Sequence, residues 1–180
     1  FIIFQLNSIL EHLAEKDEVV IVDDCSNDKT IEVLRELNDP RIKIHRNKIN
    51  RGEVFSFNRA ITLAKNDFIF LSDQDDIWLP EKISLMQSAL IRSNSNLVTS
   101  NFSWIDKHNN LIHEKFDGVN SSQTRKYIRN IVDIFIGKTN YFGCAMALRK
   151  DFLSVVLPIP SYVESHDLWI ALASNITRSN

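Results

Sequence analysis

The sequence predicts an α/β protein in which a mostly parallel, twisted sheet is covered by helices on both faces. Apolar runs rich in β-forming residues alternate with amphipathic segments along the chain, and polar turn residues separate them. Alternating strands and helices are typical of parallel sheets, because the helices carry the chain back across the sheet. With 180 residues and 44% hydrophobic residues, the chain can bury one core and is predicted to form a single domain, 1–180.

The first half of the chain supplies most of this alternation. Leu6, Ile9 and Leu13 recur at helical spacing, and Ile42 and Ile44 alternate with polar residues as in a strand. Gly52 permits an unusual backbone angle before a helix, and Pro80 suits the first turn of another. The expected elements are helix 4–13, strand 19–22, helix 31–39, strand 42–45, helix 53–65, strand 68–72 and helix 80–93.

The second half contains a polar stretch, 106–124, which predicts a surface excursion rather than core. Around it we expect strand 97–104, helix 127–136, strand 141–148 and a last helix that follows His166 and ends near Ser174. Small residues in 141–148 favour close approach of a backbone or ligand. Trp104, Trp169 and the phenylalanines are assigned to core packing.

Composition excludes several classes of protein. The formal net charge is −2 and no Lys/Arg run stands out, which argues against a nucleic-acid partner. Cys25 and Cys144 lack metal-site spacing and fit a reducing cytoplasm, although a bridge between them stays open. No apolar stretch is long enough to span a bilayer. Because the chain begins at Phe1 within an apolar run, it is expected to be an excerpt of a longer protein.

Acids follow two of the expected strands. The run 68–71 is succeeded by Asp73, Asp75 and Asp76, and the run 19–22 by Asp23 and Asp24. Neighbouring parallel strands would aim these carboxylates at one crevice beyond their carboxyl ends. Crowded carboxylates repel one another, and hard oxygen ligands suit Mg²⁺ or Mn²⁺. The alternative is an acid-rich turn that lies in water.

Five strings, in order, resemble the inverting, GT-A-type glycosyltransferases of family 2. The strings are Val22-Asp23-Asp24-Cys25-Ser26-Asn27-Asp28-Lys29-Thr30, Asn50-Arg51-Gly52 with Asn58-Arg59-Ala60-Ile61, Asp73-Gln74-Asp75-Asp76, Gly143-Cys144-Ala145 and His166-Asp167-Leu168-Trp169. Cys25 replaces the usual Gly, and His166 replaces the usual Glu. The third string and the His-Asp pair look most like the rhamnosyltransferase-like branch. The family's opening strand, of the type VSVIIPTYN, is missing.

The resemblance implies roles for the acids. Asp75 is the expected metal ligand, Asp73 contacts the metal or the ribose, and Asp76 holds the donor sugar or supports the site. Asp23 and Asp24 are expected near the nucleotide. Asp76 could instead cap a helix.

Further residues are expected to handle the diphosphate and the acceptor. Arg51 is placed against the diphosphate or base, with a solvated loop arginine as the alternative. Asp167 is the expected catalytic base, although it too could simply cap a helix. His166 is a secondary candidate for a metal or phosphate contact, with a structural histidine as the alternative. Trp78 is assigned to core packing or to stacking on a sugar face.

The implied function is Mn²⁺- or Mg²⁺-dependent transfer of a sugar from a nucleotide-diphosphate donor to a glycan or lipid-linked acceptor, in cell-surface polysaccharide synthesis. Residues 1–104 would form the donor half and residues 105–180 the acceptor half. Such an enzyme is expected in the cytoplasm, with peripheral association at the inner face of the membrane left open. The alternatives are a nucleotidyltransferase that makes nucleotide sugars, a metal-independent glycoside hydrolase, and an inactive nucleotide- or glycan-binding domain.

Overall fold

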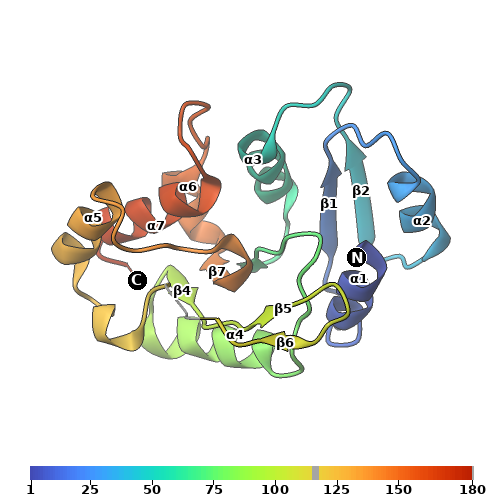
Figure 1. Cartoon of the computed structure of the whole chain (residues 1–180). Helices are drawn as coiled ribbons and strands as arrows, with labels where there is room; N and C mark the ends of the chain where they lie inside the picture. The colour runs from blue at the N-terminus through green and yellow to red at the C-terminus, as the bar shows by residue number, and fades with distance from the viewer. Residues whose placement is uncertain (115–117, 180) are drawn as a thin grey trace.

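The computed structural model describes residues 1–114 and 118–179, and Figure 1 shows the arrangement of its elements. The helices are α1 (Ile2–Leu10), α2 (Thr30–Glu36), α3 (Glu53–Leu63), α4 (Lys82–Ser93), α5 (Tyr127–Phe135), α6 (Leu153–Val156) and α7 (His166–Ile176). The strands are β1 (Val19–Asp23), β2 (Ile42–Arg46), β3 (Phe68–Phe70), β4 (Leu97–Thr99), β5 (Trp104–Ile105), β6 (Leu111–Ile112) and β7 (Met146–Arg149). Short 3₁₀ turns are η1 (Ser121–Gln123), η2 (Gly143–Ala145) and η3 (Lys150–Phe152). Residues 115–117 of the expected surface excursion lie outside the described residues.

The strands form separate groups. β1 and β2 pair in parallel, as expected, with Val19 opposite Ile42. β7 lies between β3 and β4 and runs antiparallel to both, so this sheet is mixed rather than parallel throughout. β5 and β6 form a small antiparallel pair. β7 runs antiparallel to β3, so the first residues of β7 pair with the last residues of β3. The turn η2, which precedes β7, therefore lies beside the acids that follow β3.

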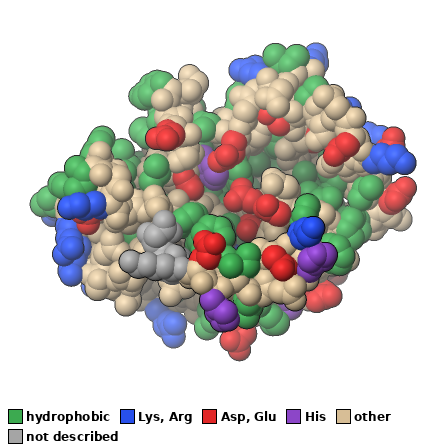
Figure 2. Space-filling view, viewed as in Figure 1, with side chains coloured by type: hydrophobic (Ala, Val, Ile, Leu, Met, Phe, Trp, Pro, Cys, Tyr) green, Lys and Arg blue, Asp and Glu red, His purple; other side chains and the backbone are tan. Residues whose placement is uncertain are grey.

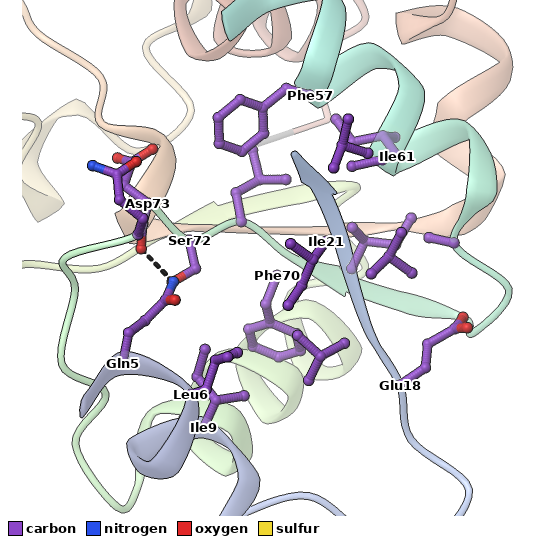
Figure 3. Close-up of a pocket in the computed structure, with 18 of the residues that line it drawn as sticks. Gln5, Leu6, Ile9, Glu18, Ile21, Phe57, Ile61, Phe70, Ser72 and Asp73 are labelled. Atoms are coloured by element: carbon purple, nitrogen blue, oxygen red, sulfur yellow. Dashed lines mark hydrogen bonds between the residues drawn. The ribbon is translucent and has the colours of Figure 1, made fainter. Parts of the chain in front are cut away.

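A cavity of about 1290 Å³ lies between β1 and β3, and residues of α1 and α3 also line it. Figure 3 shows Ile21 of β1, Phe57 and Ile61 of α3 and Phe70 of β3 around it. The sheet pairings of the described residues do not join β1 to β3. This gap is compatible with the expected absence of the family's first strand, because an added strand could pair with both edges.

The main core lies around β7, and its fully buried members include Leu148, Met146 and Phe152 with Ile170 of α7. Assigning Trp104 to the core was wrong: it is 38% exposed and packs edge-on against Phe102 and Phe142. Among the described phenylalanines, Phe1, Phe4 and Phe135 lie at the surface, so assigning them to the core was also wrong. Among the described residues, no helix has both the length and the apolar character needed to cross a bilayer.

Candidate active site

The loop that follows β3 is held in a tight turn. Asp76 Oδ2 accepts a hydrogen bond of 2.7 Å from the backbone N–H of Asp73. Trp78 is buried beneath the loop, and its Nε1 donates to Ser72 Oγ at 3.2 Å. From α1, Gln5 donates to Ser72 Oγ and to the carbonyl of Asp73 (Figure 3). These contacts orient the loop toward the cavity. The observed role of Asp76 is to stabilise the turn through its hydrogen bond with the Asp73 N–H.

The carboxylates of this loop repel one another. Burial, followed by the charges of Asp76, Glu53, Asp75 and Asp167, raises the pKa of Asp73 to about 6. Burial also raises the pKa of Asp76. A bound cation would relieve this repulsion, since it favours the ionised form of each carboxylate.

The side chains whose possible metal-ligand atoms lie close together differ in part from the predicted metal ligands Asp75, Asp73 and His166. Among the described residues, ligand atoms of Asp73, Asp76 and Cys144 lie within 4.8 Å of one another. Burial raises the pKa of the Cys144 thiol to about 12, so the thiol stays protonated and offers a hard cation little. The oxygens of Asp73 and Asp76, with those of exposed Asp75 on the same loop, are the donors that fit Mg²⁺ or Mn²⁺.

Asp23 is the last residue of β1 and Asp24 follows it, and the two carboxylates have different partners. Asp23 is buried, and its Oδ2 lies 3.0 Å from Nε of Arg46 in an ion pair. Asp24 accepts hydrogen bonds of 2.7 Å from Asn47 Nδ2 and from the backbone N–H of Gly52.

Those hydrogen bonds hold Asp24 in its ionised form. Burial pushes its pKa upward, but the hydrogen bonds from Asn47 and the loop before α3 outweigh burial and lower the pKa. The Arg51 backbone N–H donates to Asp24, whereas its guanidinium lies over the ring of Phe55, 4.1 Å from the centroid. The Arg51 side chain is not among the residues that line the cavity. Its predicted contact with a diphosphate stays a prediction.

Asp167 lies in the first turn of α7 and lines the same cavity as Asp24 and Asp75. Its Oδ1 accepts from Ser165 Oγ at 2.5 Å and from its neighbour's backbone N–H. Its Oδ2 accepts from the backbone N–H of Gly143 at 3.1 Å. Ser165 is the N-cap of the helix, so Asp167 is available for another role.

Among the described residues, the ring nitrogens of His166 are not grouped with the ligand atoms of Asp73 and Asp76. The ring is 2% exposed and stacks on Phe57 with centroids 3.7 Å apart. Nδ1 lies 2.8 Å from Glu53 Oε1, and a Cβ on Gly143 would lie 2.6 Å from Nε2. Burial lowers the pKa of His166 despite the carboxylates beside it. The structure therefore does not bring His166 to Asp73 as a metal ligand. The ring instead packs between Phe57 of α3 and Gly143 of η2.

Gly143→Ala is expected to destabilise the fold by about 1–3 kcal/mol, because the new methyl group would overlap the His166 ring between Gly143 and Phe57. Urea unfolding measures this loss. In the double variant Gly143→Ala/His166→Ala the methyl group has room, so the combined loss should be smaller than the sum of the single losses. An additive double variant would contradict the overlap.

The cavity joins acids from distant parts of the chain. Asp24, Asp73, Asp75 and Asp167 all line it, and Figure 2 shows acidic side chains gathered in the central hollow. Sequence reasoning missed Glu53, which also lines the cavity.

Lys82 was also missed. Its Nζ donates to the carbonyl of Cys144 at 2.5 Å and lies 5.0 Å from the Trp78 ring centroid. Burial lowers its pKa, while the charge of Asp76 opposes this effect. In the sequence, only its position shortly after the string Asp73-Gln74-Asp75-Asp76 could have indicated that Lys82 lies near these acids.

Comparisons with a family model and with known proteins all match this chain to glycosyltransferases. The model of Glycosyl transferase family 2 matches residues 2–157. The chain is 30% identical over 125 residues to the UDP-Glc:alpha-D-GlcNAc-diphosphoundecaprenol beta-1,3-glucosyltransferase WfgD of Escherichia coli, covering 69% of this chain and 49% of that protein. It is 36% identical over 104 residues to the dTDP-rhamnosyl transferase RfbG of Shigella flexneri, covering 54% of this chain and 36% of that protein.

A solved structure supports the fold. S. aureus TarS 1-349 in complex with UDP-GlcNAc matches with a TM-score of 0.74 at 19% identity, covering 98% of this chain and 50% of that chain. This likeness confirms the expected GT-A fold. The chain spans half, or less, of the length of these proteins.

Proposed function

Because this chain belongs to glycosyl transferase family 2, we propose that it transfers a sugar from a nucleotide-diphosphate donor to a hydroxyl group of a glycan or lipid-linked acceptor, with inversion at the anomeric carbon. The relative WfgD, whose name specifies a diphosphoundecaprenol-linked acceptor, supports a lipid-linked acceptor. The rhamnosyl transferase RfbG keeps a deoxysugar donor among those to test.

One observation carries the proposal: acids from three separate regions of the chain line a single cavity. Asp24 comes from the end of β1, Asp73 from the loop after β3, and Asp167 from α7. The donor half, 1–104, would supply the first two and the acceptor half, 105–180, the last. In this proposal, the acids that bind the cation and the nucleotide and the acid that acts as base would lie on different elements around one cavity, which is compatible with an in-line displacement.

The loop after β3 is proposed to bind the diphosphate through a divalent cation. Asp75 and Asp73 would hold the ion, and Asp76 would keep the turn in shape through its bond to the Asp73 N–H. A bound Mn²⁺ or Mg²⁺ would neutralise the charge that develops on the leaving diphosphate. Asp24, kept ionised by its hydrogen bonds, orients the loop before α3 and would face the nucleotide.

Asp167 is proposed to take the proton of the attacking hydroxyl group. As the acceptor oxygen bonds to the anomeric carbon, the bond from that carbon to the phosphate oxygen breaks, and its electron pair leaves with the diphosphate. The proton passes to the Asp167 carboxylate. Ser165 and Gly143 hold that carboxylate in a fixed orientation. The family match favours this transfer over nucleotide-sugar synthesis and over glycoside hydrolysis.

A panel of UDP-, dTDP- and GDP-sugars, each with and without Mn²⁺, tests the proposal by thermal shift and by release of the nucleoside diphosphate. We expect one donor to raise the melting temperature only with the metal present, because a ligand that binds the folded state alone stabilises it by mass action. The free sugars with Mn²⁺ are the control. Equal shifts with and without Mn²⁺, or cleavage of glycans without any donor, would contradict the proposal.

A further inference from the structure

Helix α5 presents an apolar face that the rest of the described chain does not cover. Ile128 and Phe135 are each 74% exposed, and Val132 and Ile136 are exposed beside them. Their spacing of four, three and one residues places them on one side of the helix. Figure 2 shows hydrophobic side chains at the edge of the molecule where Figure 1 places α5.

The opposite face of α5 is fixed to the protein. Asn130 is buried, and its Nδ2 donates to Asn175 Oδ1 of α7 at 2.9 Å and to the carbonyl of Gln123 at 3.0 Å. Ile134, one turn further on, packs against the main core. The helix therefore cannot rotate to bury its apolar face, because the buried amide of Asn130 would then lose its hydrogen-bond partners.

Basic residues lie at both ends of α5, and Arg129 lies within the helix. The exposed basic side chains around α5 are Arg125, Lys126, Arg129 and Lys138. Asp133 is the acidic residue within the helix, and Arg129 lies 3.5 Å from it. No ion pair involves the other three within residues 1–114 and 118–179. The edge is therefore positively charged on a chain whose formal net charge is −2.

We propose that α5 lies in the plane of an anionic membrane surface, with Ile128 and Phe135 inserted among the lipids and the basic residues on the headgroups. Apolar side chains with Lys and Arg along one border are typical of helices that bind membrane interfaces. Cores of protein–protein interfaces, by contrast, are poor in charge and especially in Lys.

The position of α5 connects this surface with the cavity. α5 contacts α7, and α7 carries Asp167. Membrane binding through α5 would hold the acceptor half against the bilayer, where a lipid-linked acceptor is found. This step rests on the proposed function, whereas the membrane contact itself does not.

Co-sedimentation with lipid vesicles tests the contact. The full chain should bind phosphatidylcholine vesicles that contain about 30% phosphatidylglycerol, bind pure phosphatidylcholine at least about tenfold more weakly, and be released by salt. Ile128→Ser/Phe135→Ser should lower binding more than about tenfold. Arg125→Gln/Lys126→Gln should lower it about fivefold for each charge removed.

Matched variants on α4 and α2 are the controls. Leu85→Ser/Ile91→Ser removes exposed apolar side chains from α4, and Arg35→Gln/Arg92→Gln removes exposed charges from α2 and α4. Both should bind as the unaltered chain does. Equal loss in these controls, or no preference for anionic vesicles, would overturn the proposal.

A second copy of the chain is the competing occupant. If the chain forms dimers without lipid, and Ile128→Ser/Phe135→Ser makes it monomeric, α5 is a protein interface and the membrane proposal fails. Vesicle binding needs neither donor nor metal, so its failure is separable from failure of glycosyl transfer. Transfer to a water-soluble acceptor should persist in the α5 variants, because their substitutions lie outside the cavity lining.

Discussion

Asp167→Asn is expected to keep donor binding and to lower glycosyl transfer by about 10²–10⁴-fold, the usual contribution of a general base. The amide of Asn cannot accept the proton of the attacking hydroxyl group at neutral pH. Its oxygen can still accept the hydrogen bond from Ser165 Oγ that holds the side chain in place. Donor binding is measured by thermal shift with Mn²⁺, and transfer by release of nucleoside diphosphate.

Asp151→Asn is the matched control, because it makes the same chemical change on an exposed carboxylate that does not line the cavity. Ser165→Ala separates orientation from proton transfer, since it leaves the carboxylate but removes the 2.5 Å hydrogen bond to it. We expect Ser165→Ala to lose much less activity than Asp167→Asn. Full transfer by Asp167→Asn would refute the base assignment.

The acids at strand ends were the part of the site that sequence could predict. Hydrophobic runs followed by carboxylates place Asp24 and Asp73 at carboxyl ends of strands, and the structure puts both on one cavity. Asp167 followed from the family resemblance, and it lines that cavity too. These predictions depend on local pattern and chain order, which a sequence displays directly.

Features that depend on packing between distant segments were not predictable. The contact of Glu53 with His166 joins residues from α3 and α7, and His166 is not grouped with the loop acids that it was expected to join. β7 comes from far along the chain and pairs antiparallel with β3 and β4, which no local sequence pattern indicates. Trp104 is exposed because the strand expected over 97–104 ends at Thr99, and Trp104 lies in the separate β5–β6 pair outside the main core.

Asp75→Ala is expected to abolish the metal-dependent stabilisation by a donor nucleotide and to lower transfer by about 10²–10³-fold, as removal of one transition-state charge contact does. For a donor present at a hundred times its dissociation constant, the stabilisation lost is about 2.7 kcal/mol. Asp75 is exposed at the cavity, so its removal should leave the unliganded fold nearly unchanged. Gln74→Ala, a neutral change at the neighbouring position, is the control for disturbance of the loop.

Asp73→Asn should behave differently in the absence of metal, because the pKa of Asp73 is raised to about 6 in the folded protein from 3.8. The folded state then binds more protons than the unfolded state between these values, so stability falls as pH rises from about 4 to about 6. Asn removes that loss and should stabilise the metal-free protein at pH 7, by on the order of 1 kcal/mol after allowance for solvent screening.

The same pKa sets the pH dependence of metal binding. Protons compete with the cation for Asp73 below about pH 6, so Mn²⁺ should raise the melting temperature more at pH 7 than at pH 5. Asp73→Asn should reduce this difference between the two pH values, and Asp75→Ala should lose the Mn²⁺ effect at both. An Asp75→Ala protein with an intact Mn²⁺ effect would show that Asp73 and Asp76 hold the ion without Asp75.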